Sequence, residues 1–462
     1  MDDNVSWTAP EHGGQGGELA ASAGKISEFA DNLRELRGAG LSIQLAQSLL
    51  RYAAVGGPQH VLMRKPATDA QCQSFDESLR GAWQKVLNVE LTPPVWKRAE
   101  LPLKMGGLAT GTVTPRAASA FLCSWTRTQA EVLRRVGLQS VGALVQADDV
   151  LGAQIQEARR VATGMGAPEA KLPFAPDGPA PRPTRQKAFV EAISEATRNG
   201  WLREDSAWTN TQKAQLRSVS GPGAAGFLLL PTQPDHHVED NLFRAAVVRR
   251  LGGTVVPREG QNATCELVSR EGRCTVPLDG AAVHANQCKC GGLVMRRHDR
   301  VVKWLAEWLG DGRVESDVLV EQVVACENIP DGRLDVTFEQ EGRRVWLDVA
   351  VVATRTANER EIRRRAKNDG SAARDEEVSK KSRYRGLATP FVIEAYGRPG
   401  QCARGIIGKY CQDRGSGDSA DAAAAWQTLS AIIQAGSSDL ELRACGWAPA
   451  NRGEATFTYN GA

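Results

Sequence analysis

The sequence predicts a mixed α/β protein of several domains, with a helical N-terminal region, a small zinc knuckle and a C-terminal α/β domain. Apolar residues recur at three-to-four spacing through most of the first 160 residues, as in amphipathic helices. Cysteines and a histidine cluster between positions 265 and 290, and two strand-like segments, RLDVTFEQ and RVWLDVAVV, follow near position 340. A chain of 462 residues has room for about two to four such domains.

Composition excludes several classes of protein. With 42% hydrophobic residues the chain can build real cores, and a net charge of +3 gives no global signature of nucleic-acid binding. The exception is local: residues 360–385 hold ten Lys and Arg against five Asp and Glu. No apolar run is long enough to cross a membrane and the start does not resemble a signal peptide, so we expect a nuclear or cytoplasmic protein without a membrane partner.

Shifts in composition predict the domain boundaries. Pro and Gly are concentrated in one stretch that we interpret as the main linker, and the Gly- and Ala-rich start gives no periodic signal. The expected parts are a flexible N-terminus (1–24), a helical region (25–163), the linker (164–186), a helical connector (187–260), the knuckle (261–295), the α/β domain (296–412), and a linker with a C-terminal helix (413–462). Within the connector, Arg249 and Arg250 are interpreted either as a solvated helix face or as nucleic-acid contacts.

The cysteine cluster has the composition of a structural zinc site. Its spacing is Cys265-x8-Cys274-x9-His284-x3-Cys288, which supplies the four Cys/His ligands that structural zinc takes. Cys290 is a rival to Cys288 for the fourth position. The alternative is a set of buried or free cysteines beside an unrelated histidine.

The two strand-like segments each contain one aspartate among apolar residues. Asp335 and Asp348 therefore fall on a predicted hairpin, where burial requires a polar partner or a cation. The basic segment EEVSKKSRY follows, read as one basic helix that offers Lys380 or Lys381. Two carboxylates and a lysine suit metal-assisted phosphodiester hydrolysis. The alternative is that the aspartates cap or pair with nearby arginines.

Several of these motifs together resemble a known family. LLRY (49–52), LPLKMGGLATG (101–111) and SAFLCSW (119–125) are similar to the helical segment that follows the polymerase core in non-LTR retrotransposon reverse transcriptases. The two cysteines, LDGAAVHANQC with Asp279 and His284, and RRHD (296–299) resemble the CCHC knuckle before the endonuclease of the site-specific elements. No aromatic-x-Asp-Asp turn is present, so reverse transcription is not expected of this chain.

The resemblance implies a restriction-endonuclease-like domain of the PD-(D/E)XK type that nicks DNA to prime reverse transcription done elsewhere. Asp335 and Asp348, with Glu321, would bind Mg²⁺ or Mn²⁺, with Lys380 or Lys381 as the catalytic lysine and Tyr384 as its companion. The family's Pro before the first Asp is Leu334 here, and Ala350 stands where ordinary restriction enzymes place the lysine. DNA contacts would come from the following residues: Arg297, His298, Arg360, Arg363, Arg364 and Arg365.

The expected partners are DNA, retroelement RNA and a polymerase portion encoded upstream. One alternative is a catalytically inactive remnant that binds nucleic acid through the knuckle and the basic helix. Another is a stand-alone repair or resolvase-type nuclease, which would have no need of the polymerase-like helical segments. For His298, a capping or packing role is the alternative to a place in the site.

Overall fold

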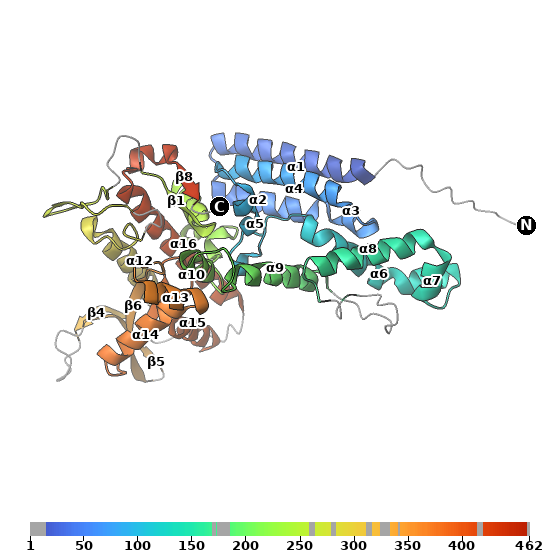
Figure 1. Ribbon diagram of the computed structural model, residues 1–462. Helices are drawn as coiled ribbons and strands as arrows, with labels where there is room; N and C mark the ends of the chain where they lie inside the picture. The colour runs from blue at the N-terminus through green and yellow to red at the C-terminus, as the bar shows by residue number, and fades with distance from the viewer. Residues whose placement is uncertain are drawn as a thin grey trace, which may run out of the picture. The chain divides into compact units, whose positions relative to one another are not determined.

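The computed structural model describes residues 15–168, 172, 185–257, 264–278, 283–310, 317–323, 333–340, 342–413 and 419–459. They fall into two compact units (Figure 1). Unit 1 comprises Met1–Leu41, Leu49–Asn88 and Ala109–Gly200, and unit 2 comprises Ser42–Ser48, Val89–Leu108 and Trp201–Ala462. The expected knuckle, α/β domain and C-terminal helix therefore belong to one unit, together with part of the expected helical region and the connector from Trp201 on.

Unit 1 is helical throughout its described residues, as the apolar periodicity predicts. Helices α1 and α4 run side by side in it (Figure 1). Its helices are α1 (Gln15–Gly38), α2 (Ile43–Gly56, from Leu49 on), α3 (Gln59–Arg64), α4 (Asp69–Leu87), α6 (Thr114–Val136), α7 (Val141–Ala147), α8 (Asp149–Gly164) and α9 (Gln186–Leu202, up to Gly200).

Helix α1 corrects the prediction of a flexible segment over 1–24. It begins at Gln15, and Leu19 and Ala23 are buried on the same stripe as Ile26 and Leu33. The small residues around Leu19 hide this apolar period in the sequence, but they suit close packing. Most of the expected linker, residues 169–171 and 173–184, and also residues 1–14, lie outside the described residues.

Unit 2 combines helices with small sheets. Its helices are α5 (Pro93–Ala99), α10 (Asn210–Ser218), α11 (Asp240–Arg250), α12 (Leu293–Gly310), α13 (Glu359–Lys367), α14 (Ser371–Arg383), α15 (Gln401–Asp413) and α16 (Ser419–Ala444). Short 3₁₀ turns are η1 (Leu103–Met105), η3 (Gly226–Leu228), η4 (Pro234–His236), η5 (Cys290–Gly292) and η6 (Pro449–Glu454). Two small sheets pair β1 (Gly253–Val255) with β8 (Phe457–Tyr459) and β2 (Val268–Ser269) with β3 (Gly272–Arg273).

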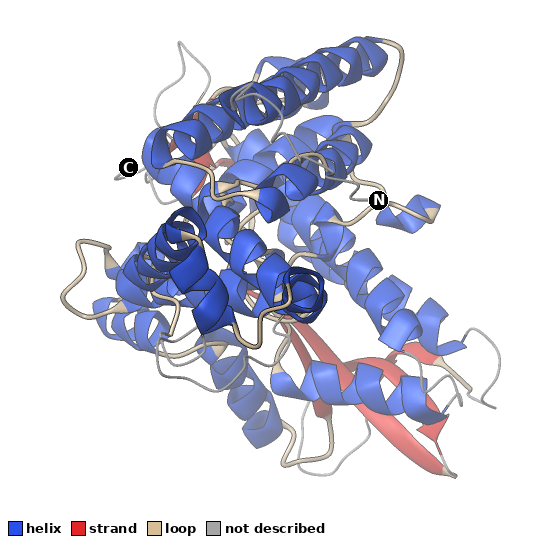
Figure 2. Ribbon diagram, turned by 90° about the vertical axis from the view of Figure 1, so that its right-hand side faces the viewer, coloured by secondary structure: helices blue, strands red, loops and turns tan. Residues whose placement is uncertain are grey.

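The main sheet of unit 2, among the strands drawn in red in Figure 2, has the order β4-β5-β6-β7 by its hydrogen bonds. Its strands are β4 (Leu319–Val323), β5 (Arg333–Gln340), β6 (Arg343–Val352) and β7 (Thr389–Glu394). The first three are antiparallel, and β7 joins β6 in parallel after α13 and α14. Pro390 is accommodated because β7 is an edge strand, where a missing N–H costs no ladder bond.

One face of this sheet forms the main core of unit 2. Alternating residues of the strands, such as Val336, Leu347 and Phe391, pack against helices α12, α15 and α16. Asp335 and Asp348 alternate with these core residues along β5 and β6, and neither aspartate belongs to this core. The α/β domain expected over 296–412 thus consists of α12, β4, the β5–β6 hairpin, α13, α14, β7 and α15, with two helices where one basic helix was expected.

The predicted C-terminal helix is α16, and its residues lie in two cores of unit 2. Its residues Ala425, Leu429 and Ile433 lie in the core beneath the sheet, and Leu440 and Ala444 lie in the core beside the cysteine cluster. No described helix combines the length and the apolarity needed to span a membrane.

Arg249 and Arg250 correct both interpretations of that pair, because each is almost fully buried. The Arg249 guanidinium binds the Glu441 carboxylate at 3.1 Å. Arg250 donates to the carbonyls of Gly107 and Val219 at 3.0 and 2.8 Å, among others. A buried arginine needs such acceptors, so the pair stabilises the fold and is not available to nucleic acid.

Candidate functional site

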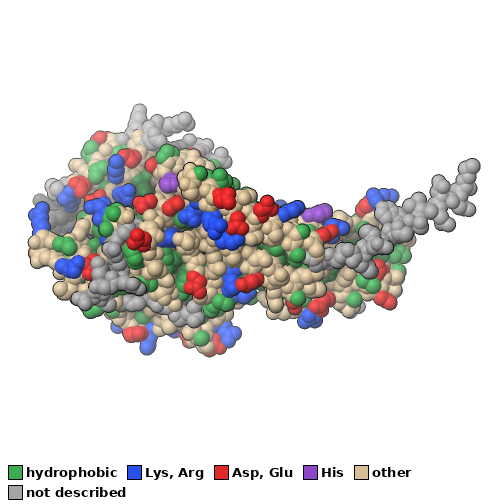
Figure 3. All heavy atoms as spheres, turned by 90° about the horizontal axis from the view of Figure 1, so that it is seen from above, with side chains coloured by type: hydrophobic (Ala, Val, Ile, Leu, Met, Phe, Trp, Pro, Cys, Tyr) green, Lys and Arg blue, Asp and Glu red, His purple; other side chains and the backbone are tan. Residues whose placement is uncertain are grey.

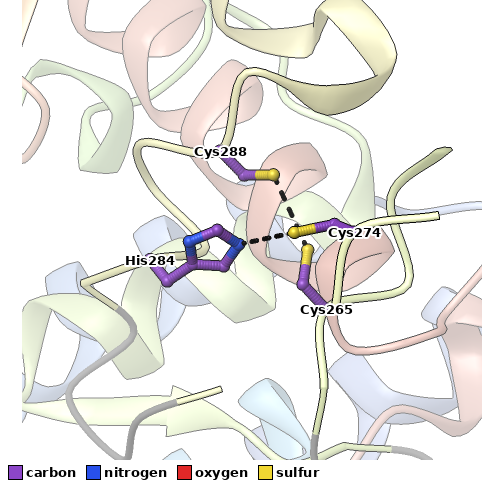
Figure 4. Close-up of side chains that lie close together, drawn as sticks. All are labelled: Cys265, Cys274, His284 and Cys288. Atoms are coloured by element: carbon purple, nitrogen blue, oxygen red, sulfur yellow. Dashed lines mark hydrogen bonds between the residues drawn. The ribbon is translucent and has the colours of Figure 1, made fainter. Parts of the chain in front are cut away.

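The predicted cysteine and histidine ligands come together. The Cys265, Cys274 and Cys288 sulfurs and one ring nitrogen of His284 all lie within 4.8 Å of one another (Figure 4). The Cys274 sulfur is 3.3 Å from His284 Nε2, and the sulfurs of Cys265 and Cys288 are 3.8 Å apart. These four form the group, so Cys288 rather than Cys290 supplies its last member. The set could bind a metal ion such as zinc.

Two of the three thiols in this group are harder to ionise than a free cysteine. Burial raises the pKa of the Cys265 and Cys288 thiols, while the backbone N–H of Val276 lowers that of Cys274. Buried thiols of this kind bind a metal only as thiolates, so metal uptake would release protons. Asp279, which matches the resemblance, lies outside the described residues.

The knuckle is joined to the rest of unit 2 by hydrogen bonds from its own side chains. Asn286 Nδ2 donates to Glu441 Oε1 on α16 at 2.6 Å. Gln287 Nε2 donates to the carbonyl of Arg355, three residues beyond β6, at 3.1 Å. The knuckle therefore contacts both α16 and the loop that follows β6.

Strand register explains how the two predicted carboxylates meet. Val336 pairs with Leu347 across β5 and β6. The next position along each strand places Asp335 opposite Asp348, and opposed residues have Cβ atoms about 5 Å apart. The Val349 N–H also donates to Asp335 Oδ2 at 2.6 Å.

Lys380 completes this arrangement from α14. Its Nζ is 2.7 Å from Asp348 Oδ2, and its side chain is 12% exposed. Burial and the Asp335 carboxylate raise the pKa of Asp348, although the Lys380 ammonium opposes this. Lys381, one residue on, has an exposed side chain. Of the two candidate lysines, the structure brings Lys380 to the carboxylates.

His298 reaches Asp335, one of the two carboxylates, from α12, although it was predicted as a DNA contact. Its Nε2 is 3.4 Å from Asp335 Oδ2. Burial alone lowers the imidazole pKa, but Asp335 and Asp299 outweigh it and the pKa is raised. Burial likewise raises the Asp335 pKa by itself, yet His298 and the Val349 N–H lower it below its usual value.

Tyr384 lies beneath the site at the end of α14. It is buried with Leu334 and Ala388, and its hydroxyl lies 3.4 Å from the Arg333 carbonyl. Burial, followed by the charge of Asp348, raises the pKa of Tyr384. The phenol therefore stays neutral near the carboxylates.

Glu321 does not join the two aspartates as a close third ligand. It pairs with Arg333 and is more than half exposed. Its backbone has φ of +57°, a left-handed conformation that is strained for a residue other than glycine. Val320 and Gln322 of β4 nevertheless pair with Val336 and Leu334 of β5, so Glu321 falls opposite Asp335. The side chains of Glu321 and Asp335 line one cavity of about 330 Å³ with His298 and Val302.

The predicted basic helix is two helices, separated by Asn368–Gly370, and its arginines differ in their surroundings. Gly370 has φ of +66°, a left-handed backbone conformation, so the chain changes direction between the two helices. Arg360, Arg363 and Arg364 are exposed, although Arg363 pairs with Glu359 and Arg364 with Asp375. Arg365 donates to the carbonyls of Ala353 and Thr354 at 3.1 and 2.9 Å. Arg365 thus anchors α13 rather than facing solvent.

Arg297 also departs from the prediction of a DNA contact. Its guanidinium is buried and donates to Ser437 Oγ at 2.9 Å, on α16. Basic side chains that do reach the surface stand among acidic ones on the face that Figure 3 shows. The candidate DNA-contacting residues are therefore reduced to the exposed arginines of α13.

Sequence patterns indicate the burial, partial for His298 and full for Glu394, of two residues that the prediction did not place in the interior. His298 lies three and four positions before Val301 and Val302, so it belongs to the buried stripe of its helix. Glu394, at the end of the apolar strand β7, is fully buried. An acid at the end of an apolar strand is the only sequence signal for it.

The arrangement brings together a carboxylate with a lowered pKa, a second carboxylate with a raised pKa, a lysine and an imidazole. No model of a known protein family and no curated protein matches this chain.

Proposed function

We propose that unit 2 carries a metal-dependent DNA endonuclease that nicks target DNA, derived from a non-LTR retrotransposon polyprotein. The observation that carries this proposal is the meeting of Asp335, Asp348 and Lys380 from three separate elements. Sequence spacing alone leaves Lys380 more than thirty positions from the nearer aspartate. Their convergence supports a catalytic role over scattered surface charges.

The chain's own residues would divide the work as follows. Asp335, already ionised, and Asp348 would hold Mg²⁺ or Mn²⁺, which when bound polarises a phosphodiester and acidifies a water. Lys380 would leave Asp348 to stabilise the charge that develops on the phosphate or to orient the water. Tyr384 would support the lysine from below, and the exposed Arg360 and Arg363 would neutralise DNA phosphates.

The Cys265, Cys274, His284 and Cys288 group is proposed to hold structural zinc. Four closed ligands leave no open position for a substrate, which is the pattern of a structural rather than a catalytic zinc site.

A second candidate is a catalytically silent protein that binds nucleic acid. The observation that favours it is that Lys380 is bonded to Asp348, so the site is closed on that side. The exposed arginines of α13 would then be the remaining functional feature.

Plasmid nicking separates the two candidates. We expect the full chain with Mg²⁺ or Mn²⁺ to convert supercoiled plasmid to open circles. Asp335→Asn and Asp348→Asn should each lower the rate by roughly 100-fold or more, because each removes a cation ligand. Asp317→Asn, an acid exposed beside β4, is the matched control and should nick normally. If wild type and both variants bind DNA and none nicks, the nuclease proposal fails.

A further inference from the structure

Each ring nitrogen of His298 faces a carboxylate. Nε2 lies 3.4 Å from Asp335 Oδ2, and Nδ1 lies 3.1 Å from Asp299 Oδ1. The imidazole is about one fifth exposed, so its orientation is set by packing and by these two partners. Histidines that bind metals have this arrangement: one nitrogen points to the ion and the other is held by a carboxylate.

The open side of the carboxylate pair is the side of His298. His298, Asp335, Val302 and Glu321 line the same cavity of about 330 Å³, while Asp348 and Lys380 do not line it. Lys380 already occupies Asp348 Oδ2 on the other side. A hydrated ion would therefore reach Asp335 beside the imidazole.

Distances agree with a shared ion. Neighbouring ligands of an octahedral ion, each about 2.1 Å from it, lie roughly 3 Å apart. The separation between His298 Nε2 and Asp335 Oδ2 is close to this value, so small side-chain adjustments would complete the geometry. Waters and the substrate phosphate would take the remaining positions.

We propose that His298 and Asp335 are both direct ligands of the divalent ion, and that the imidazole makes the site select Mn²⁺ over Mg²⁺. The inference rests on the proposed function in taking Asp335 as a cation ligand. Mg²⁺ is a hard ion that takes oxygen ligands, whereas first-row transition ions accept imidazole nitrogen. A site with one nitrogen ligand therefore disfavours Mg²⁺ more than Mn²⁺.

Ion binding tests this without DNA or catalysis. Zinc-loaded full-length protein would be titrated with Mn²⁺ and the free ion followed by electron paramagnetic resonance, with Mg²⁺ as competitor. We expect His298→Gln to weaken Mn²⁺ binding by about tenfold or more while changing Mg²⁺ binding little. His237→Gln removes an exposed histidine of the same unit and is the matched control.

A variant with the opposite ion preference, for Mg²⁺ over Mn²⁺, would distinguish a metal ligand from a packing residue. His298→Glu offers an oxygen in the same place, and we expect it to bind Mg²⁺ more tightly than wild type does. Circular dichroism of each variant shows whether it is folded, and the Glu variant keeps the test decisive if the Gln variant is not. A residue that merely orients Asp335 would not produce this gain.

The outcomes for ion binding and for nicking are distinct. Equal Mn²⁺ affinity in wild type and His298→Gln, or no Mn²⁺ bound by wild type, overturns the inference. If equal affinity is accompanied by nicking that depends on Asp335, the proposed function stands without it. Mn²⁺ binding that depends on His298 in a protein that does not nick supports the ion site and removes the nuclease.

Discussion

Lys380 and Lys381 are neighbours of the same type in opposite surroundings. The Lys380 ammonium binds Asp348 at 2.7 Å, and the Lys381 side chain is exposed. Because α14 turns by about 100° per residue, only one of two successive lysines can face the sheet. This choice could not be made from the sequence, since both fit the same helical pattern.

We predict different consequences for removing each lysine. Lys380→Met should lower the nicking rate by roughly 100-fold or more, because the ammonium that stabilises developing phosphate charge or orients the water is lost. Lys381→Met should nick at close to the wild-type rate and is the matched control. Equal losses in the two variants would contradict the assignment of Lys380. Single-turnover plasmid nicking at saturating Mn²⁺ measures both.

At the scale of elements, β7 and α14 are connected through a buried acid. Glu394 ends β7, and its carboxylate accepts from the Ala373 N–H in the first turn of α14 at 3.3 Å. Burial raises the Glu394 pKa, although Ser218, the Ala373 N–H, Arg398 and Arg365 oppose this. The folded state therefore holds the proton more tightly than the unfolded state does.

This shift predicts how stability depends on pH. An acid with a raised pKa in the folded state loses stability as pH rises above the unfolded value, about 4.3 for glutamate. Glu394→Gln should remove that loss, so its stability relative to wild type should increase from pH 4 towards neutral pH. Urea unfolding of both proteins over this range measures the difference. A difference that stays constant with pH would show that Glu394 does not titrate as described.

The elements differ in how well the sequence predicts them. The alternation of β5 and β6 identifies the hairpin, and its register follows from the apolar face, so Asp335 and Asp348 could be placed together in advance. The orientation of Arg297 and Arg365 could not, because a helix pattern does not reveal which distant carbonyl or hydroxyl will accept from them. The burial of Leu19 could not be predicted either, because its neighbours in α1 are small residues that hide the apolar period.

At the scale of the molecule, one helix of unit 2 takes part in two cores. The cysteine cluster packs against Leu440 and Ala444 of α16, and the same helix carries Leu429 and Ile433 beneath the sheet. Helical periodicity predicts that α16 exists but says nothing of its partners. The boundaries expected between the knuckle, the α/β domain and the C-terminal helix therefore give no information on how these three parts pack.

Removing metal should affect all of unit 2. We expect purified protein to hold about one zinc ion per chain, and chelation to lower the melting temperature of the unit that includes α16. Cys288→Ser should lose the zinc, whereas Cys290→Ser should retain it, because Cys290 lies outside the ligand group. Metal analysis and calorimetry check this. Full zinc occupancy in Cys288→Ser would contradict the ligand set.

The position of α16 also bears on how such a protein can change in evolution. Shuffling of domains requires boundaries that few contacts cross. In unit 2 the helix that closes the core below the sheet comes after the last strand of that sheet and also completes the seat of the cysteine cluster. A recombination that transferred the acidic hairpin without residues 419–444 would leave both cores open. The knuckle, the hairpin and the C-terminal helix are thus expected to be inherited together.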